Sequence, residues 1–206
     1  NMEIIQLEEG GVQTSQRNWY TNQLQAIFEP VKDWRIVVEG SMRTYTRKQH
    51  WAVLPIYGYD VNNKPYLLSW NGGAAGYSEV QDEREDEDYF SGNIYSDYAK
   101  TIGNHYFKVM GGFNAELFRP SGMTGLISSN VPSLGLTQDN QKANAWARER
   151  AIAGFFGRVN YNYKERYMLE ANLRYDGSSR FVGDKRWGLF PSFSAGWNIA
   201  REDFFR

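Results

Sequence analysis

Residues 155–176 alternate between apolar and polar side chains, and no other feature of the sequence constrains the fold as strongly. In 167–176 the odd positions carry Tyr, Leu, Ala, Leu and Tyr, whereas the even positions carry Met, Glu, Asn, Arg and Asp. Residues 155–164 alternate in the same way, and a tight turn is expected at 164–166. Because successive side chains of a strand point to opposite faces, this period of two predicts an antiparallel hairpin with one apolar face.

The same pattern recurs along the chain, which predicts an all-β fold with about seven strands in an antiparallel up-and-down meander. The further predicted strands are 19–28, 34–45, 89–100, 105–118 and 189–200. Short connections alternate with longer ones in the order 29–33, 46–88, 101–104, 119–150, 164–166 and 177–188. Transmembrane β-barrels alternate short periplasmic turns and longer extracellular loops in this way. About nine strand residues at ~3.3 Å, tilted by ~40°, would rise ~23 Å, close to the ~25 Å apolar band of such barrels.

The composition excludes several functional classes. The 23 basic and 24 acidic residues give a formal net charge of −1, so no basic excess is available for nucleic acid. With no Cys and two His, the chain lacks the residues for disulfides, Cys nucleophiles or a His-rich metal site. We therefore expect no catalytic residue, no metal, no cofactor and no nucleic-acid partner.

Aromatic residues make up 16% of the chain and gather near the predicted strand ends. The residues concerned are Trp19, Trp34, Tyr45, Tyr89, Tyr106, Tyr163, Tyr167, Tyr175, Trp187 and Trp197. In a membrane barrel they would form the two interface girdles. In a soluble β-sandwich the same rings would stack on sugars. Aromatic residues at both ends of 167–175 favour the girdles, and the sugar-binding sandwich stays open as the alternative.

Three polar groups invite a functional interpretation. The acidic run 82–88 lacks the spacing of a calcium loop and is expected to be a solvated surface loop. The segment 176–181 combines Asp, Ser and Arg, but no His lies nearby to act as a base, so a glycine turn is expected. Glu116, Glu170 and Asp97 could supply the carboxylate pair of a glycoside hydrolase. They are more simply explained as residues that line a water-filled barrel interior.

Two segments are ambiguous. Residues 143–153 have a composition that suits a helix, but they are expected to extend the next strand outward. Residues 56–60 and 66–70 are expected to form a small hairpin inside the long connection. The chain begins Asn-Met-Glu without a secretory signal, so either a cytoplasmic protein or an interior piece of a longer one is expected, and the first residue, which is not Met, favours the second.

The C-terminal quarter carries a specific set of strings in order. They are FFGRVNYNYKERY (155–167), LEA (169–171), RYDGSSRF (174–181), RWG (186–188), FPS (190–192), SAGW (194–197) and EDFF (202–205). With these strings the chain resembles the SusC/RagA-like TonB-dependent transporters of Bacteroidetes outer membranes. The signature loop consists of Asp176, Gly177, Ser178, Ser179, Arg180 and Phe181. Residues 1–150 carry no such motif and fit the same barrel only through their alternation of strands with short and long connections.

The resemblance implies a location in the bacterial outer membrane and a barrel of about 22 strands with a plugged lumen. It implies membrane lipid, the TonB complex and a SusD-like surface lipoprotein as partners, and glycans or peptides as the imported nutrients. Residues 1–206 would then be a partial barrel domain without the plug. The resemblance carries no substrate-binding residue over to this chain. An isolated segment should neither insert nor transport, because unpaired strand edges in lipid cost several kcal/mol per group.

In this hypothesis the odd face of 155–175 contacts lipid. The residues expected to face the lumen are Arg158, Asn160, Asn162, Glu170, Asn172 and Arg174. A soluble carbohydrate-binding β-sandwich and a glycoside hydrolase remain the alternatives from other functional classes.

Overall fold

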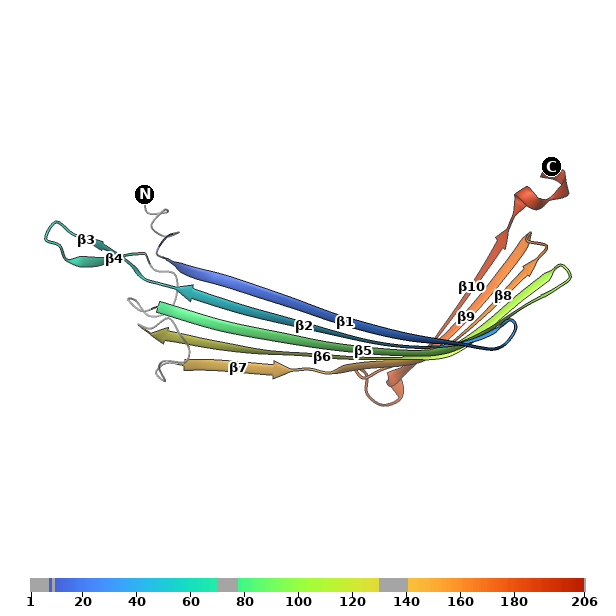
Figure 1. Cartoon of the computed structure of the whole chain (residues 1–206), viewed down its shortest axis with the longest axis horizontal. Coiled ribbons are helices and arrows are strands. Elements are labelled where there is room, and N and C mark those ends of the chain that lie inside the picture. The colour runs from blue at the N-terminus through green and yellow to red at the C-terminus, as the bar shows by residue number, and fades with distance from the viewer. Residues whose placement is uncertain (1–7, 9, 70–77, 130–140, 206) are drawn as a thin grey trace. The chain divides into compact units, whose positions relative to one another are not determined.

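The computed structural model describes residue 8 and residues 10–69, 78–129 and 141–205, which are almost entirely antiparallel β-structure (Figure 1). The large sheet has eight strands in the order β1-β2-β5-β6-β8-β9-β10, with β7 also paired to β6. A two-stranded sheet pairs β3 with β4. Within the described residues, no helix is long and apolar enough to cross a membrane.

All seven predicted strands are present, and the antiparallel meander is confirmed. The large sheet consists of β1 (Gly11–Val31), β2 (Trp34–Val53), β5 (Ser78–Ile102), β6 (His105–Ser129), β7 (Gln141–Ala147), β8 (Arg150–Tyr163), β9 (Tyr167–Ser178) and β10 (Trp187–Trp197). The small hairpin is also confirmed, as β3 (Ile56–Tyr59) and β4 (Pro65–Ser69), while the predicted end of its second strand, Trp70, lies outside the described residues. Short 3₁₀ turns follow at Gly183–Arg186, Ile199–Arg201 and Asp203–Phe205.

The predicted strand length is wrong for the first four long strands. β1 has 21 residues, β2 has 20, and β5 and β6 have 25 each. Strands β2, β5 and β6 run into the segments predicted as long connections, so that the acidic run 82–88 lies inside β5 and is not a loop, while β1 begins before its predicted start.

The described chain divides into two compact units, and most long strands contribute a part to each. The first unit contains Asn1–Tyr20, Thr44–Glu87 and Pro120–Arg148. The second unit contains Thr21–Arg43, Asp88–Arg119 and Glu149–Arg206.

In the second unit, regular strand pairing gives the sheet two faces of opposite character. The β8–β9 pairing sets Arg158 against Asn172 and Val159 against Ala171, so polar and apolar residues form separate rows. Large apolar side chains on the second face remain open, with Leu169 54% and Phe193 80% exposed. An apolar face of this kind in a single sheet needs cover from outside the chain.

The buried apolar residues of the described chain are few. They are Val37, Ile56, Val80 and Ile127. A β-sandwich requires two sheets that bury their facing side chains against each other. The described strands form one eight-stranded sheet and one two-stranded hairpin instead, so the soluble sandwich alternative is wrong.

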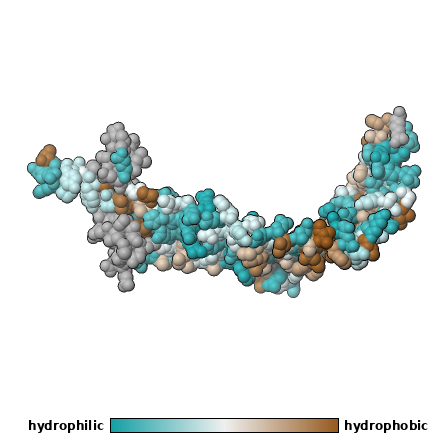
Figure 2. All heavy atoms as spheres, in the orientation of Figure 1, coloured by the Kyte–Doolittle hydropathy of each residue, from teal (hydrophilic) through white to brown (hydrophobic). Residues whose placement is uncertain are grey.

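In the first unit both faces of the sheet are polar, which explains why the sequence pattern missed it. Arg47 on β2 lies 3.1 Å from Glu83 and 3.0 Å from Glu85 on β5. On the opposite face, His50 Nδ1 lies 2.6 Å from Asp82. Figure 2 shows hydrophilic residues across much of the visible surface of this unit, whereas hydrophobic residues gather in part of the second. Without an apolar face there is no alternation to detect.

Strands β2 and β5 keep a single register along their length. Side-chain hydrogen bonds or ion pairs join Arg35 to Asp97, Ser41 to Ser91, Thr46 to Asp86, and His50 to Asp82. The two residue numbers of each pair add to the same value, so no bulge separates these positions.

Strand β7 continues β8 outward, as expected for 143–153. Both pair with β6 in one register, with Phe118 opposite Arg150 and Ser121 opposite Ala147. The interruption falls where Pro120 faces Arg148, because proline has no N–H to donate to the ladder. The Pro120 carbonyl still accepts a hydrogen bond of 2.9 Å from the Arg148 amide.

The predicted short connections are confirmed as tight turns after β1, β5 and β8, and Figure 1 shows them at one end of the second unit. Each uses the left-handed backbone region, at Asp33 (φ 71°), Gly103 (φ 59°), and Lys164 and Glu165 (φ 53° and 55°). These conformations allow adjacent antiparallel strands to be joined by very few residues.

Candidate functional site

The candidate site is the polar face of the second unit, where the structure brings most of the predicted lumen residues into one hydrogen-bonded row. Arg158 Nε donates to Asn172 Oδ1 at 2.6 Å, and Asn160 Nδ2 donates to Glu170 Oε2 at 2.5 Å. Asn172 Nδ2 donates to Glu170 Oε1 at 2.7 Å, which closes the row. The register of β8 and β9 makes these contacts possible, because it places Arg158 opposite Asn172 and Asn160 opposite Glu170.

Arg174 forms the next part of this face. Its guanidinium donates to both oxygens of Asp176, at 3.1 and 2.9 Å, and stacks 5.5 Å from the centre of the Phe156 ring. The Asp176 carboxylate lies over Gly154, where a Cβ atom would be 1.9 Å from Oδ1. The ion pair of Arg174 and Asp176 therefore lies close to the backbone of the sheet.

The polar face extends across β5 and β2. Asp97 is only 6% exposed and accepts two hydrogen bonds from Arg35, at 3.0 and 2.9 Å. Lys108 Nζ on β6 lies 3.3 Å from the other Asp97 oxygen. Glu116 lies beside Tyr89. The three carboxylates considered for glycoside hydrolysis, Asp97, Glu116 and Glu170, are thus each engaged by their own partners.

The signature loop is only partly a turn: Asp176, Gly177 and Ser178 end strand β9, and the turn begins at Ser179, so the expected glycine turn is wrong about where its glycine lies. The Ser179 backbone amide donates to the Ala151 carbonyl and the Ser179 hydroxyl accepts from the Ala151 amide, both at 2.9 Å. The Phe181 amide donates to the Ser178 carbonyl and the Arg180 amide to the Ser178 hydroxyl, both at 3.3 Å. These bonds extend the β8–β9 pairing by one residue and then reverse the chain.

Gly177 explains why the signature loop contains glycine. It lies opposite Trp187, and a Cβ atom there would come within 2.7 Å of the indole ring. The same indole stacks on Tyr175, with ring centres 5.0 Å apart. A larger residue at position 177 would displace this ring from the apolar face.

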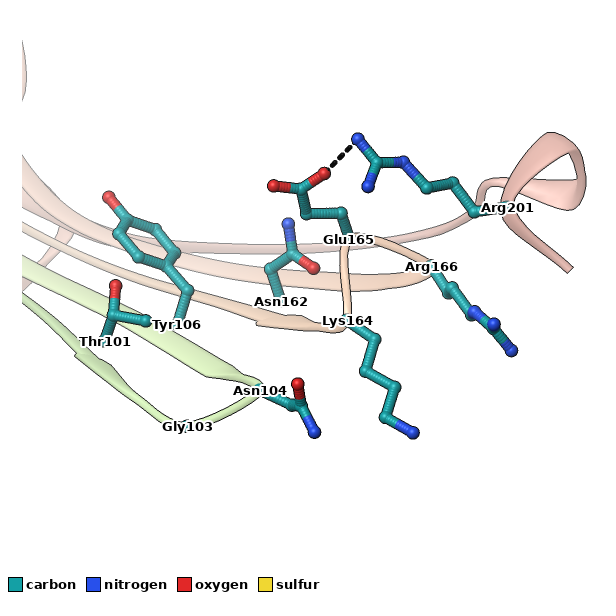
Figure 3. A pocket seen from close by; sticks show the side chains of 9 residues that line it. All are labelled: Thr101, Gly103, Asn104, Tyr106, Asn162, Lys164, Glu165, Arg166 and Arg201. Carbon is teal, nitrogen blue, oxygen red and sulfur yellow. Dashed lines mark ion pairs between the residues drawn. The ribbon is translucent and has the colours of Figure 1, made fainter.

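Asn162 is separated from the hydrogen-bonded row and lines a cavity of about 650 Å³ at the short-turn end (Figure 3). Its Oδ1 atom is buried and accepts no hydrogen bond from the described residues. Figure 3 shows Glu165 and Arg201 joined as an ion pair on one side of Asn162, while Arg166 points away from that pair. The cavity is rich in charge, but the described residues contain no cluster that could hold a metal ion.

The sequence interpretation missed a cluster of polar side chains around one buried carboxylate, beyond β10. Glu202 is 8% exposed and accepts hydrogen bonds from the Tyr167 hydroxyl at 2.7 Å and the Trp197 indole at 3.0 Å. Arg166 Nη1 donates to Glu202 at 3.0 Å, and Nη2 to Asp203 at 2.9 Å. The Tyr167 hydroxyl, followed by the indole of Trp197 and the charge of Arg166, lowers the pKa of Glu202 below its ordinary value.

Six of the ten aromatic residues predicted to form the girdles lie on the apolar face of the second unit. Tyr163 stacks with Tyr167 at 6.4 Å, and Tyr175 with Trp187 at 5.0 Å, all on the apolar face. The parity of β2 and β10 places Trp34 and Trp197 on this face too.

The other four predicted girdle residues do not lie on this apolar face. In the second unit, Arg43 stacks 5.2 Å from the centre of the Tyr89 ring, and Tyr106 has the parity of Lys108. In the first unit, Trp19 and Tyr45 have ring centres 5.2 Å apart, and Tyr45 has the parity of the ion-paired Arg47. Proximity to a strand end does not reveal which face a ring occupies, whereas the register does.

Comparison with known proteins gives a consistent match. The family described as TonB dependent receptor-like, beta-barrel, matches residues 7–204. The TonB-dependent receptor SusC of Bacteroides thetaiotaomicron is 33% identical over 153 residues, which are 72% of this chain and 14% of SusC. The TonB-dependent receptor P3 of Formosa agariphila is 28% identical over 118 residues, covering 54% of this chain and 12% of the receptor.

The solved structures support the same fold. The RagAB peptide transporter matches with a TM-score of 0.82 at 16% identity, covering 97% of this chain and 22% of the transporter chain. The RagAB peptide importer in its open-open state also matches with a TM-score of 0.82, at 17% identity. The chain therefore spans about a fifth or less of the length of these relatives.

Proposed function

Because the chain belongs to the family of TonB-dependent receptor-like β-barrels, we propose that it forms part of the barrel wall of an importer of nutrients such as glycans or peptides. Barrels of this family lie in the bacterial outer membrane, and this chain is part of such a barrel. The observation that carries the proposal is the contrast between the two faces of the second unit. One face is a hydrogen-bonded polar row and the other is an exposed apolar surface.

In the proposed arrangement the apolar face contacts lipid and the polar face lines the lumen. Lipid-facing and lumen-facing residues alternate along every strand of a transmembrane barrel. Leu169 and Leu173 would then meet acyl chains, while Asn160, Glu170 and Asn172 would meet water, solute or the plug. Such a wall guides passage and requires no covalent chemistry.

The proposed partners are the TonB complex, which would supply energy, and a SusD-like lipoprotein, which would capture the nutrient at the surface. Support comes from SusC, named a TonB-dependent receptor, and from the RagAB structure, named a peptide transporter. The described strands would account for about a third of a barrel of roughly 22 strands. Residues 1–206 would thus be one segment of a barrel domain, with the plug elsewhere in the full-length protein.

Two neighbouring residues of β9 test the face assignment in the full-length protein. Ala171→Arg would place a charge in lipid and should cost about 2–4 kcal/mol near the bilayer midplane, whereas Asn172→Arg should be tolerated. The stability of each variant refolded into lipid vesicles would be measured by denaturant titration. Equal losses in both variants would contradict the assignment of the faces.

Import is tested by deleting the gene for the full-length protein in its natural host. Growth on glycans and on peptides as sole carbon source should fail for one nutrient class and return when the wild-type gene is restored. A second strain that lacks the lipoprotein encoded nearest to this gene should show the same nutrient defect. Unchanged growth of the deletion strain on every nutrient in the panel would argue against an import function.

A further inference from the structure

Two arginines on the polar face of the second unit are held in place without any carboxylate partner among the described residues. The Arg43 guanidinium lies 5.2 Å from the centre of the Tyr89 ring, and that of Arg150 lies 5.4 Å from the centre of the Phe118 ring. Arginine stacked on an aromatic ring keeps its in-plane N–H donors available for a further ligand.

Both pairs lie on the same face and close to each other in the sheet. Arg43 has the parity of Arg35, which pairs with Asp97, and the β2–β5 register is unbroken between them. Arg150 lies directly opposite Phe118 across the β6–β8 pair. Strands β5 and β6 are neighbours, and Tyr89 on β5 lies beside Glu116, two residues before Phe118 on β6.

Arg174 is stacked on an aromatic ring like Arg43 and Arg150, but its charge is neutralised by a carboxylate of the same chain. It stacks on Phe156 in the same way, at 5.5 Å, but both of its donor edges are used by Asp176. Arg43 and Arg150 repeat the ring contact without the carboxylate. Their donors are therefore free to bind a carboxylate that comes from outside the described residues.

We propose that Arg43 and Arg150, with the rings of Tyr89 and Phe118, form a site that binds carboxylate groups of the imported solute. The proposal rests on the proposed function, because the polar face must line the transport path. A guanidinium matches a carboxylate with two parallel N–H donors, and the rings limit the motion of each arginine before the ligand arrives. The adjoining aromatic surface offers a stacking platform for the sugar ring or side chain that bears the carboxylate.

The test uses the full-length protein in detergent and two matched pairs of probes. One pair is an oligogalacturonate and its methyl ester, and the other is an acidic peptide and its fully amidated form. Calorimetry would compare wild type with the double variant Arg43→Gln, Arg150→Gln. The variant should bind the acid form of the transported class on the order of tenfold more weakly, and the neutralised form about equally well.

A control double variant removes the same two positive charges elsewhere. Lys32 and Lys185 are exposed residues of the β1–β2 turn and of the 3₁₀ turn before β10. Lys32→Gln, Lys185→Gln should leave both affinities within about twofold of wild type, since long-range charge effects are screened by salt. The probe pair that responds identifies the source of the carboxylate.

The remaining outcomes count against the carboxylate site. Equal binding of acid and neutral probes by wild type would overturn it while leaving the import function intact, as long as growth on a neutral nutrient still depends on the gene. A lower melting temperature of the Arg43, Arg150 variant with unchanged affinities would also overturn the carboxylate site, because the two arginines would then stabilise the fold and not bind the ligand. Loss of the growth phenotype altogether would instead remove the proposed function.

Discussion

At Gly154 the missing side chain makes room for the Asp176 carboxylate, and this gives a test at a single residue. In Gly154→Ala the new Cβ would lie 1.9 Å from Asp176 Oδ1, so the carboxylate must move and its contact with Arg174 must weaken. We expect a loss of about 1–3 kcal/mol in the free energy of unfolding of the full-length protein, as for other overpacking changes. Denaturant titration in lipid vesicles would measure it.

Gly40 of β2 provides the control for this substitution. A Cβ atom at Gly40 would meet nothing within 4 Å, and its φ is not in the left-handed region. Gly40→Ala should therefore leave stability unchanged or raise it slightly, because alanine restricts the unfolded chain more than glycine does. A similar loss in both variants would show that the space at Gly154 has no special role.

The Glu202 cluster predicts a dependence of stability on pH. The carboxylate lies beyond β10 at the short-turn end, and its pKa is lowered chiefly by the Tyr167 hydroxyl. A lowered folded pKa stabilises the folded state above the ordinary glutamate pKa of about 4.3. This stabilisation is lost as the pH falls from there through the lower folded pKa.

Glu202→Gln isolates this contribution. Wild type should be more stable than the variant at pH 7, and the difference should shrink below about pH 4.5 as the wild-type carboxylate is protonated. Melting temperatures of the full-length protein in detergent at a series of pH values would follow it. A difference that stays constant from neutral to acidic pH would mean that the charge of Glu202 contributes nothing to folding.

Among the structural elements, the paired strands β2 and β5 of the first unit depend on opposite charges. Arg47 is about one-quarter exposed and contacts both Glu83 and Glu85. Arg47→Glu would place three carboxylates together and should destabilise this pairing by about 1–2 kcal/mol, because like charges on facing strands repel. Faster hydrogen exchange of the β2 and β5 amides in the first unit would report it.

The matching control is Lys142→Glu on β7, which makes the same change in net charge. Lys142 is exposed and has no ion pair among the described residues. It should leave exchange in β2 and β5 unaltered. Restoring protection by combining Arg47→Glu with Glu83→Arg and Glu85→Arg would confirm that the effect comes from the cross-strand charges.

These two elements also mark the limit of what the sequence could predict. Alternation identified the parts of β2 and β5 in the second unit because one face there is apolar. It could not identify residues 78–88, because opposing charges occupy both faces of that pairing. The acidic run was therefore interpreted as a loop, although its partners Arg47 and His50 are visible in the sequence. Nothing in the sequence specifies that those partners are in register.

For the whole molecule, the two edges of the large sheet predict how the isolated chain will behave. Within the described residues β1 pairs with β2 alone and β10 with β9 alone, so each edge leaves a row of backbone groups unpaired. In lipid each unpaired group costs several kcal/mol. The separate 206-residue chain should associate through its edges and form no conducting pore. Size-exclusion chromatography and a vesicle dye-release assay would show aggregation without discrete pores.

The sequence was most informative about the family and least informative about side-chain partners at this scale. Strings such as RYDGSSRF and EDFF identified the family, and the structure shows part of the physical reason. Asp176 holds Arg174, Gly177 accommodates Trp187, and Glu202 joins the β8–β9 turn to the residues after β10. Those partners are separated by up to 36 residues, which a local pattern cannot connect.

The single register of β2 and β5 restricts how the length of this wall can change during evolution. One residue inserted between Arg35 and Arg47 would reverse the face of every later side chain in β2, and would move Arg47 away from its carboxylates. Two inserted residues would preserve the faces but shift the partners by a full pleat. Insertions and deletions among relatives should therefore concentrate in the long connections. Under the proposed import function, diversification for new nutrients would then proceed by substitution within the strands and by changes of length outside them.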